Sequence, residues 1–181
     1  IIAEAGSCHD GDLQRACDLI RVAAQARANA VKFQFWSSPE RLAARRHAEA
    51  FVETYRRYQL PPEWLPTLAA MATRLDLKFM CTAYLPEDVQ IVAPHVWAFK
   101  IASFEAQDRA FLVAHERWRH KRIFVSTGMM HGDAIQLLKA MSRTRNMDLI
   151  LLHCVSAYPV PLDQLNLGLI RCNFADTFLW W

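Results

Sequence analysis

The stretch Ala-Val-Lys-Phe-Gln-Phe at residues 30–35 decides the fold class. Side chains alternate along a β-strand, so one face of this stretch carries the valine and both phenylalanines. The opposite face carries Ala30, Lys32 and Gln34. A strand that helices cover on both faces is apolar throughout. The stretch therefore predicts a sheet with helices on one face and an opposite face that becomes polar toward the carboxyl end of the strand.

Five further strand-like runs flank this stretch, at residues 1–5, 78–83, 97–102, 122–127 and 148–154. In residues 97–102, large apolar side chains again alternate with Ala98, Lys100 and Ala102. Stretches of helical periodicity separate the runs, at residues 12–28, 63–75 and 132–145. The long connection from residue 35 to residue 78 has room for one extra helix, at about residues 48–58. Strand–helix alternation of this kind implies a parallel α/β sheet with right-handed crossovers.

The one-sided polarity of the strands favours a (β/α) barrel of the TIM type over a doubly wound sheet. Inward-facing side chains at the carboxyl ends of barrel strands build the active site of such a fold. A closed barrel has eight βα units, and six are recognisable in this sequence. We expect an incomplete barrel domain over residues 1–170, followed by a divergent C-terminal tail at residues 171–181.

Composition excludes several classes of protein. The 181 residues are 53% apolar and 22% charged, unlike a disordered chain. A formal net charge of +3 gives no argument for nucleic acid as a partner, and no apolar run reaches the ~18 residues of a membrane span. The five cysteines form no C-x-x-C pair, and Cys81 and Cys154 lie in strand-like runs. We therefore expect buried thiols and a reducing, cytoplasmic compartment.

Polar side chains gather where the six predicted strands end. They are Glu4, Lys32, Gln34, Thr82, Lys100, Ser103, Glu105, Ser126, Thr127, Ser156 and Tyr158. A lysine between large apolar neighbours, as Lys32 and Lys100 are, is costly to bury unless it is paired. Two such lysines facing one lumen predict an anion site, with internal ion pairs to Glu4 and Glu105 as the alternative. Any single hydroxyl can instead be satisfied by neighbouring backbone.

This set of groups suits a small ligand that carries a phosphate and a carboxylate. Lysine binds phosphate as a point charge, and hydroxyls add fixed donors. Glu4 and Glu105 are candidates to move a proton or to hold a metal-bound water. The residues by themselves thus lead to a barrel enzyme that acts on a small dianion.

The histidines predict no metal site within this chain, because no two of them have the spacing of a ligand pair. N-capping of a helix by an aspartate explains the segment around His9, Asp10 and Asp12 without a metal. We expect His153 to be a hydrogen-bonded histidine at the core or rim. Loops or exposed turns are expected for His95, His115, His120 and His131.

Five segments occur in the order and near the spacing of one known family. They are IIAEAG with HDGD (residues 1–12), AVKFQ (30–34), FKIAS (99–103), VSTGM (125–129) and HCVSAYP (153–159). Together they resemble the sialic acid synthase family, which comprises N-acetylneuraminate, pseudaminic acid and related nonulosonate synthases. The sequence Ser103-Phe104-Glu105 is similar to the pseudaminic acid branch.

The resemblance implies condensation of phosphoenolpyruvate with an N-acetylmannosamine-type sugar, which gives a nonulosonate and phosphate. It implies a divalent metal, manganese or magnesium, that polarises the sugar aldehyde. By motif match, phosphoenolpyruvate would be held by Lys32, Thr82, Lys100, Ser103 and Ser126. Gln34, Glu105 and Tyr158 would face the sugar, and Glu4 would lie near the metal or its water.

The sequence departs from the family pattern at several points. Cys8-His9-Asp10 stands where Asn-His-Asn is common, and Ser156 stands where an asparagine often precedes the tyrosine. The family's metal-binding histidines lie on its seventh and eighth strands, and its C-terminal antifreeze-like domain reaches across a dimer. None of these parts is recognisable here, so we expect an incomplete synthase whose full-length form is a homodimer and whose metal ligands lie outside this chain.

Two other functions remain open from the sequence. One is another barrel enzyme that uses phosphoenolpyruvate or pyruvate, including an aldolase that forms a Schiff base on Lys32 or Lys100. The other is a catalytically inert barrel fragment that associates through its unpaired sheet edges.

Overall fold

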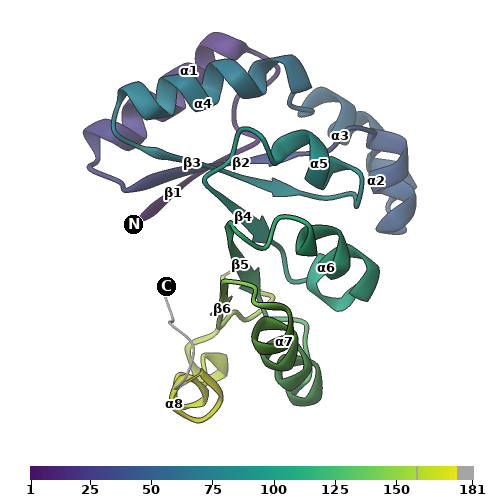
Figure 1. The fold of residues 1–181 in the computed structure, drawn as a ribbon. Coiled ribbons are helices and arrows are strands. Elements are labelled where there is room, and N and C mark those ends of the chain that lie inside the picture. The colour runs from purple at the N-terminus through teal and green to yellow at the C-terminus, as the bar shows by residue number, and fades with distance from the viewer. Residues whose placement is uncertain (158, 175–181) are drawn as a thin grey trace. The chain divides into compact units, whose positions relative to one another are not determined.

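In the computed structural model, which describes residues 1–157 and 159–174, strands and helices alternate along the chain (Figure 1). The strands are β1 (Ile2–Gly6), β2 (Ala30–Phe35), β3 (Lys78–Ala83), β4 (Ala98–Ile101), β5 (Arg122–Ser126) and β6 (Leu149–Leu152). Strand order in the sheet follows the chain, and the pairs β1–β2, β2–β3 and β5–β6 are parallel. The predicted parallel α/β fold is confirmed.

The described part of the chain also forms eight α-helices and four short 3-10 helices, of which η4 and α8 follow the last strand. The α-helices are α1 (Leu13–Gln25), α2 (Pro39–Arg45), α3 (Val52–Arg57), α4 (Leu65–Arg74), α5 (Asp88–Val92), α6 (Arg109–Glu116), α7 (Gly132–Arg145) and α8 (Gly168–Phe174). The 3-10 helices are η1 (Glu49–Phe51), η2 (Pro62–Trp64), η3 (Glu105–Gln107) and η4 (Leu162–Gln164). Among the described residues, no helix has the length and apolar character that crossing a membrane requires.

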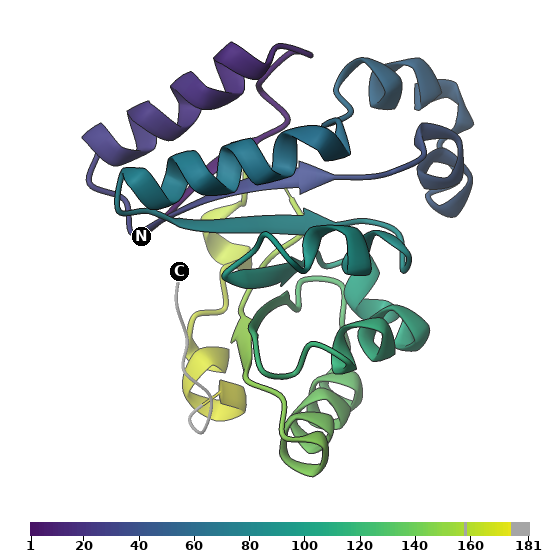
Figure 2. The same cartoon turned by 45° about the horizontal axis from the view of Figure 1, so that its top comes forward.

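The chain forms two compact units, Ile1–Phe99 and Lys100–Trp181. In the first unit, α1 and α4 lie side by side over one face of the sheet, as Figure 1 and Figure 2 show from two directions. The helix α1 begins where the Asp12 carboxylate accepts a hydrogen bond from the Arg15 amide at 3.0 Å. Its buried stripe consists of Ala16, Cys17, Ile20 and Ala23.

The central strand β2 supplies much of the core of this unit. Its three large apolar side chains are fully buried, and the Phe33 ring packs against Phe79 of β3 with centroids 5.9 Å apart. Lys32 pairs with Met80 and Gln34 with Thr82 in the register of β2 and β3, so these four side chains share the opposite face. The alternation predicted for residues 30–35 and 78–83 is therefore confirmed in strands of those bounds.

The connection between β2 and β3 differs from the sequence prediction. One extra helix was expected at about residues 48–58, where η1 and α3 lie, but α2 precedes them. Ser38 caps α2, since its Oγ accepts from the Arg41 amide at 3.2 Å, and Pro39 begins the first turn. The prediction of a single helix was wrong, because the seven residues of α2 are too few to show a helical period in the sequence. The pair Ser38-Pro39 was the signal for the start of this helix.

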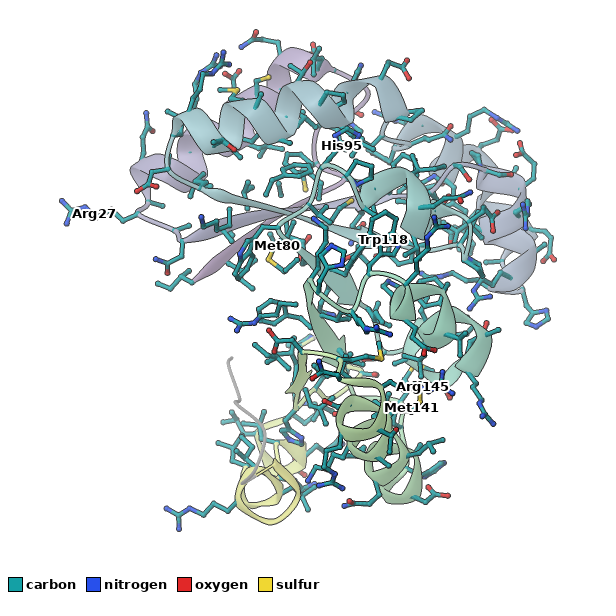
Figure 3. All side chains as sticks on the ribbon, viewed as in Figure 1. Arg27, Met80, His95, Trp118, Met141 and Arg145 are labelled. Atoms are coloured by element: carbon teal, nitrogen blue, oxygen red, sulfur yellow. The ribbon has the colours of Figure 1, made fainter. Side chains whose placement is uncertain are left out.

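In the second unit, α6 and α7 are joined by an ion pair between Glu116 and Arg145. Figure 3 shows Arg145 and Met141 on α7. The strands are shorter here than the sequence indicates: β6 ends at Leu152, so Cys154 lies beyond the strand and is half-buried. The expectation of a buried thiol is confirmed for Cys81 and wrong for Cys154, because the apolar run continues past the last paired residue.

The expectation that His115 lies in a loop or exposed turn is wrong. His115 belongs to α6 and is fully buried, with its Nδ1 2.9 Å from the Phe111 carbonyl oxygen and its ring packed on the Phe111 ring. Four-residue spacing places these two aromatic groups on the same helix face. Burial lowers the pKa of His115 to about 4.

This burial predicts a specific pH dependence of stability. An unfolded histidine titrates near 6.5, so the stability contributed by neutral His115 is complete above that pH and is lost as the pH falls toward 4. His115→Gln should reduce the loss of unfolding free energy between pH 7 and pH 5 by about 2 kcal/mol, measured by denaturant titration. His120→Gln, at an exposed histidine, serves as the control and should keep the wild-type slope. An unchanged slope in His115→Gln would contradict the burial.

Candidate functional site

The first cluster of polar side chains surrounds Lys32 in the first unit. Strand pairing places Glu4 of β1 opposite Lys32, and the two side chains form an ion pair. Lys32 Nζ also donates to the hydroxyl of Thr82 in β3 at 3.3 Å. The Lys32 side chain is 10% exposed and that of Glu4 is 52% exposed. A buried ammonium group is thus satisfied by one carboxylate and one hydroxyl from the two neighbouring strands.

The end of β1 contributes to this arrangement. The register of β1 and β2 shifts between Glu4 and Gly6, and Gly6 has a φ of +57°, which favours glycine. Gly6 is the last residue of β1, two residues after Glu4. The half-exposed carboxylate of Glu4 therefore lies near the end of the strand when it pairs with Lys32. The internal ion pair that the sequence left as an alternative is therefore present for Lys32.

Gln34 lies on the same strand face as Lys32, one side-chain repeat closer to the carboxyl end. Its register partner is Thr82, and it is half-buried. Lys32, Gln34 and Thr82 are therefore brought together on one face of β2 and β3, as the sequence predicted.

The second cluster lies in the second unit and is centred on Ser126. Lys100 Nζ donates to the Ser126 hydroxyl at 2.6 Å and to the Ile101 carbonyl oxygen at 3.0 Å. Ser126 also accepts from the Cys154 thiol at 3.3 Å. An ammonium group beside a strand-end hydroxyl thus occurs in both units.

Cys154 was not predicted as a member of this cluster. It lies in the segment His-Cys-Val-Ser at residues 153–156, directly after β6. The signal for Cys154 was its place two residues before Ser156, which was itself a candidate.

The remaining candidates of the second unit have different surroundings. Ser103 is half-buried after β4, and Glu105 is fully buried at the start of η3. The Thr127 hydroxyl donates to the Leu152 carbonyl oxygen at 2.9 Å, the backbone-satisfied alternative considered for single hydroxyls. Ser156 is exposed, and Tyr158 lies outside the described residues.

A groove lies at the carboxyl ends of β5 and β6. It is lined by residues that include Thr127, Gly128, His153 and Cys154. The segments come very close at Gly128, where an added Cβ would lie 2.8 Å from Ser156 Oγ and 3.0 Å from the Cys154 carbonyl oxygen. Only a glycine lets the two chain segments approach each other in this way.

Two histidines of the sequence analysis take structural roles. His153 Nε2 lies 2.8 Å from the Leu165 carbonyl oxygen, which confirms a hydrogen-bonded rim histidine. His9 is buried against Trp64, its Nδ1 accepts from the Gly11 amide at 3.1 Å, and burial lowers its pKa. The capping role of Asp12 is confirmed at the start of α1.

In residues 1–157 and 159–174, no group of three His, Cys, Asp or Glu side chains is arranged to hold a metal ion. Glu4, the residue that the resemblance places near a metal, is instead ion-paired with Lys32. The described residues therefore do not fit a complete divalent metal site.

A parallel α/β sheet with polar side chains at the carboxyl ends of its strands is typical of α/β barrel enzymes. The chain belongs to the NeuB family, whose model matches residues 19–178.

Named relatives agree with this assignment. The chain is 31% identical to a pseudaminic acid synthase of Campylobacter jejuni over 92% of this chain and 52% of that protein. It is 29% identical to the N,N'-diacetyllegionaminic acid synthase of the same species, over 98% of this chain and 57% of that protein. Both relatives are nonulosonate synthases, and the chain spans about half of their length.

A solved structure shows the same fold. The N-acetylneuraminic acid synthetase of Leptospira borgpetersenii superposes with a TM-score of 0.88 and 27% identity, over 99% of this chain and 63% of that one. The resemblance to the sialic acid synthase family, drawn from the short motifs, is confirmed.

The close approach at Gly128 gives a prediction. Gly128→Ala should lower the free energy of unfolding by about 1–3 kcal/mol, because backbone at Cys154 must move to admit the methyl group. Denaturant titration measures the change. Gly132→Ala is the matched control, since nothing lies within 4 Å of its added Cβ at the start of α7, and it should be neutral or stabilising. Equal stability of the two variants would contradict the close packing of these segments.

Proposed function

We propose that this chain carries the phosphoenolpyruvate-binding part of a nonulosonate synthase, which condenses phosphoenolpyruvate with an N-acetylmannosamine-type sugar. The observation that carries the proposal is a lysine ammonium group hydrogen-bonded to a hydroxyl, which occurs in both units. Lys32 donates to Thr82 in the first unit, and Lys100 donates to Ser126 in the second. Family membership supports the reaction class, since the named relatives are synthases of nine-carbon acids of this kind.

The two ammonium groups would neutralise the phosphate and carboxylate of phosphoenolpyruvate, and the hydroxyls of Thr82, Ser126 and Ser103 would donate to their oxygens. Glu4 forms an ion pair with Lys32, so a bound anion would share or replace the contact of Glu4 with that ammonium group. The displaced carboxylate of Glu4 would be free to accept a proton or to orient a water.

The sugar would meet Gln34, Glu105, Ser156 and Tyr158. Carbon 3 of phosphoenolpyruvate would attack the sugar aldehyde, whose oxygen takes a proton, and water would add at carbon 2. Cleavage of the carbon–oxygen bond would then release phosphate. Thr127 would act by fixing the chain at Leu152, because its hydroxyl is already engaged there.

The proposal includes the remaining parts of the enzyme. Residues 1–170 would form six units of the barrel, and the complete protein would be a homodimer. Manganese or magnesium would need ligands beyond those of the described residues.

Binding of phosphoenolpyruvate tests the proposal. Calorimetry should show a heat of binding for the wild-type chain, and Lys32→Met and Lys100→Met should each weaken the Kd by about 10- to 100-fold, the effect of losing a hydrogen bond to a charged group. Lys78→Met is the control, because Lys78 is exposed at the amino end of β3. Absence of wild-type binding, or equal loss in the control, would overturn the proposal.

A second experiment separates the synthase from an aldolase. A synthase holds its ligand without a covalent bond to lysine, so treatment with pyruvate and borohydride should leave the mass of the chain unchanged. An adduct mapped to Lys32 or Lys100 by mass spectrometry would favour the aldolase instead.

Phosphate release by the wild-type chain from phosphoenolpyruvate, in the presence of manganese and N-acetylmannosamine, should not exceed phosphate release by Lys100→Ala.

A further inference from the structure

Asp88, the first residue of α5, is a fully buried carboxylate outside the candidate site. Its Oδ1 accepts from the Ser37 amide at 3.1 Å, and its Oδ2 accepts from the Leu85 amide at 3.1 Å. Leu85 is close in sequence, but Ser37 is 51 residues away. The bond to Leu85 is a local contact at the start of α5, whereas the bond to Ser37 joins two separate connections of the sheet.

The two amides lie at equivalent points beyond two neighbouring strands. Ser37 follows Gln34 by three residues, and Leu85 follows Thr82 by three residues. Gln34 and Thr82 are themselves register partners in β2 and β3. One carboxylate therefore joins the segments that leave the strands directly after two candidate ligand-binding side chains.

The carbonyl oxygens of the segment after β2 also accept hydrogen bonds. The Gln59 side-chain amide donates to the Trp36 carbonyl oxygen at 3.1 Å and to the Ser37 carbonyl oxygen at 2.9 Å. Trp36 is buried, and its indole donates to the Tyr55 carbonyl oxygen at 2.9 Å. The Trp36 ring also packs edge-on against Tyr84, with centroids 5.9 Å apart. The bond from the Ser37 amide to Asp88 adds a hydrogen bond to this packing between the segment after β2 and the segment after β3.

We propose that Asp88 is a positioning residue: it ties the segment after β2 to the segment after β3. The tie holds Thr82 in the geometry that binds the anion, and it holds Gln34, which would meet the sugar, beside Thr82. This inference rests on the proposed function of the Lys32 cluster. Asp88 touches no reacting group and acts through the backbone of Ser37 and Leu85.

The charges around Asp88 make the tie sensitive to acid. Burial raises the pKa of Asp88 to about 6, against the opposing effect of the hydrogen bonds from Ser37 and Leu85. Glu87 raises it further, Cys81 of β3 is the other titratable neighbour, and Arg41 of α2 is ion-paired with Glu87. Below about pH 6 one oxygen of the carboxyl group becomes a donor, so only one of the two backbone amides keeps its acceptor.

The tie itself is tested on the 181-residue chain by nuclear magnetic resonance. The amide resonances of Ser37 and Leu85 should both titrate with a midpoint near pH 6 in the wild type and should lose that transition in Asp88→Asn. Asp76→Asn is the matched control, since Asp76 is exposed in the turn before β3 at a positive φ that asparagine tolerates. If neither wild-type amide titrates near pH 6, the proposal is overturned whether or not a ligand binds.

The consequence for the site is tested by calorimetry with phosphoenolpyruvate at pH 8, where wild-type Asp88 is ionised. Asp88→Asn should weaken the Kd about tenfold, the effect of one lost backbone bond to a charged acceptor, while Asp76→Asn keeps the wild-type value. Equal affinity of Asp88→Asn and wild type would overturn the positioning role. Failure of the wild type to bind would overturn the proposed function and with it the role of Asp88, even if both amides titrate.

Discussion

The buried ammonium group of Lys32 needs hydrogen-bond acceptors, and the strand order of the first unit supplies them. An amino group in the middle of a sheet is stable only if acceptors replace the water that it loses. Because β2 lies between β1 and β3, one neighbour supplies Glu4 and the other supplies Thr82. The parallel register places both partners on the face of Lys32, so the charge and the strand pairing depend on each other.

Lys100 in the second unit is satisfied by the same kind of contact. The Ser126 hydroxyl is at once an acceptor for Lys100 and for the Cys154 thiol, so three strand ends meet at one oxygen atom. Each contact restricts the conformations open to the lysine side chain that makes it. In the anion site proposed above, side chains held in this way would lose less freedom on binding than ones that must be ordered around the ligand.

The segments after the strands carry a second level of organisation. In parallel α/β folds these segments form the functional face, and short connections leave few atoms with which to fix them. Here Gly128 lets the connection after β5 approach Cys154, and Asp88 and Gln59 hold the connection after β2. The chain shares its fold with the NeuB family, and these contacts hold the segments that follow the strand-end side chains of this chain.

The sequence by itself determined the strands, the fold class and the family, because alternation and short motifs are local properties. The bounds of β2, β3 and α7 follow directly from it, as does the shared face of Lys32 and Thr82. Tertiary structure alone decided the ion pair of Lys32 with Glu4, the burial of His115 and the contact between Asp88 and Ser37. Each of these depends on which distant segments meet, and that is set by the packing of whole elements, which no local pattern of residues encodes.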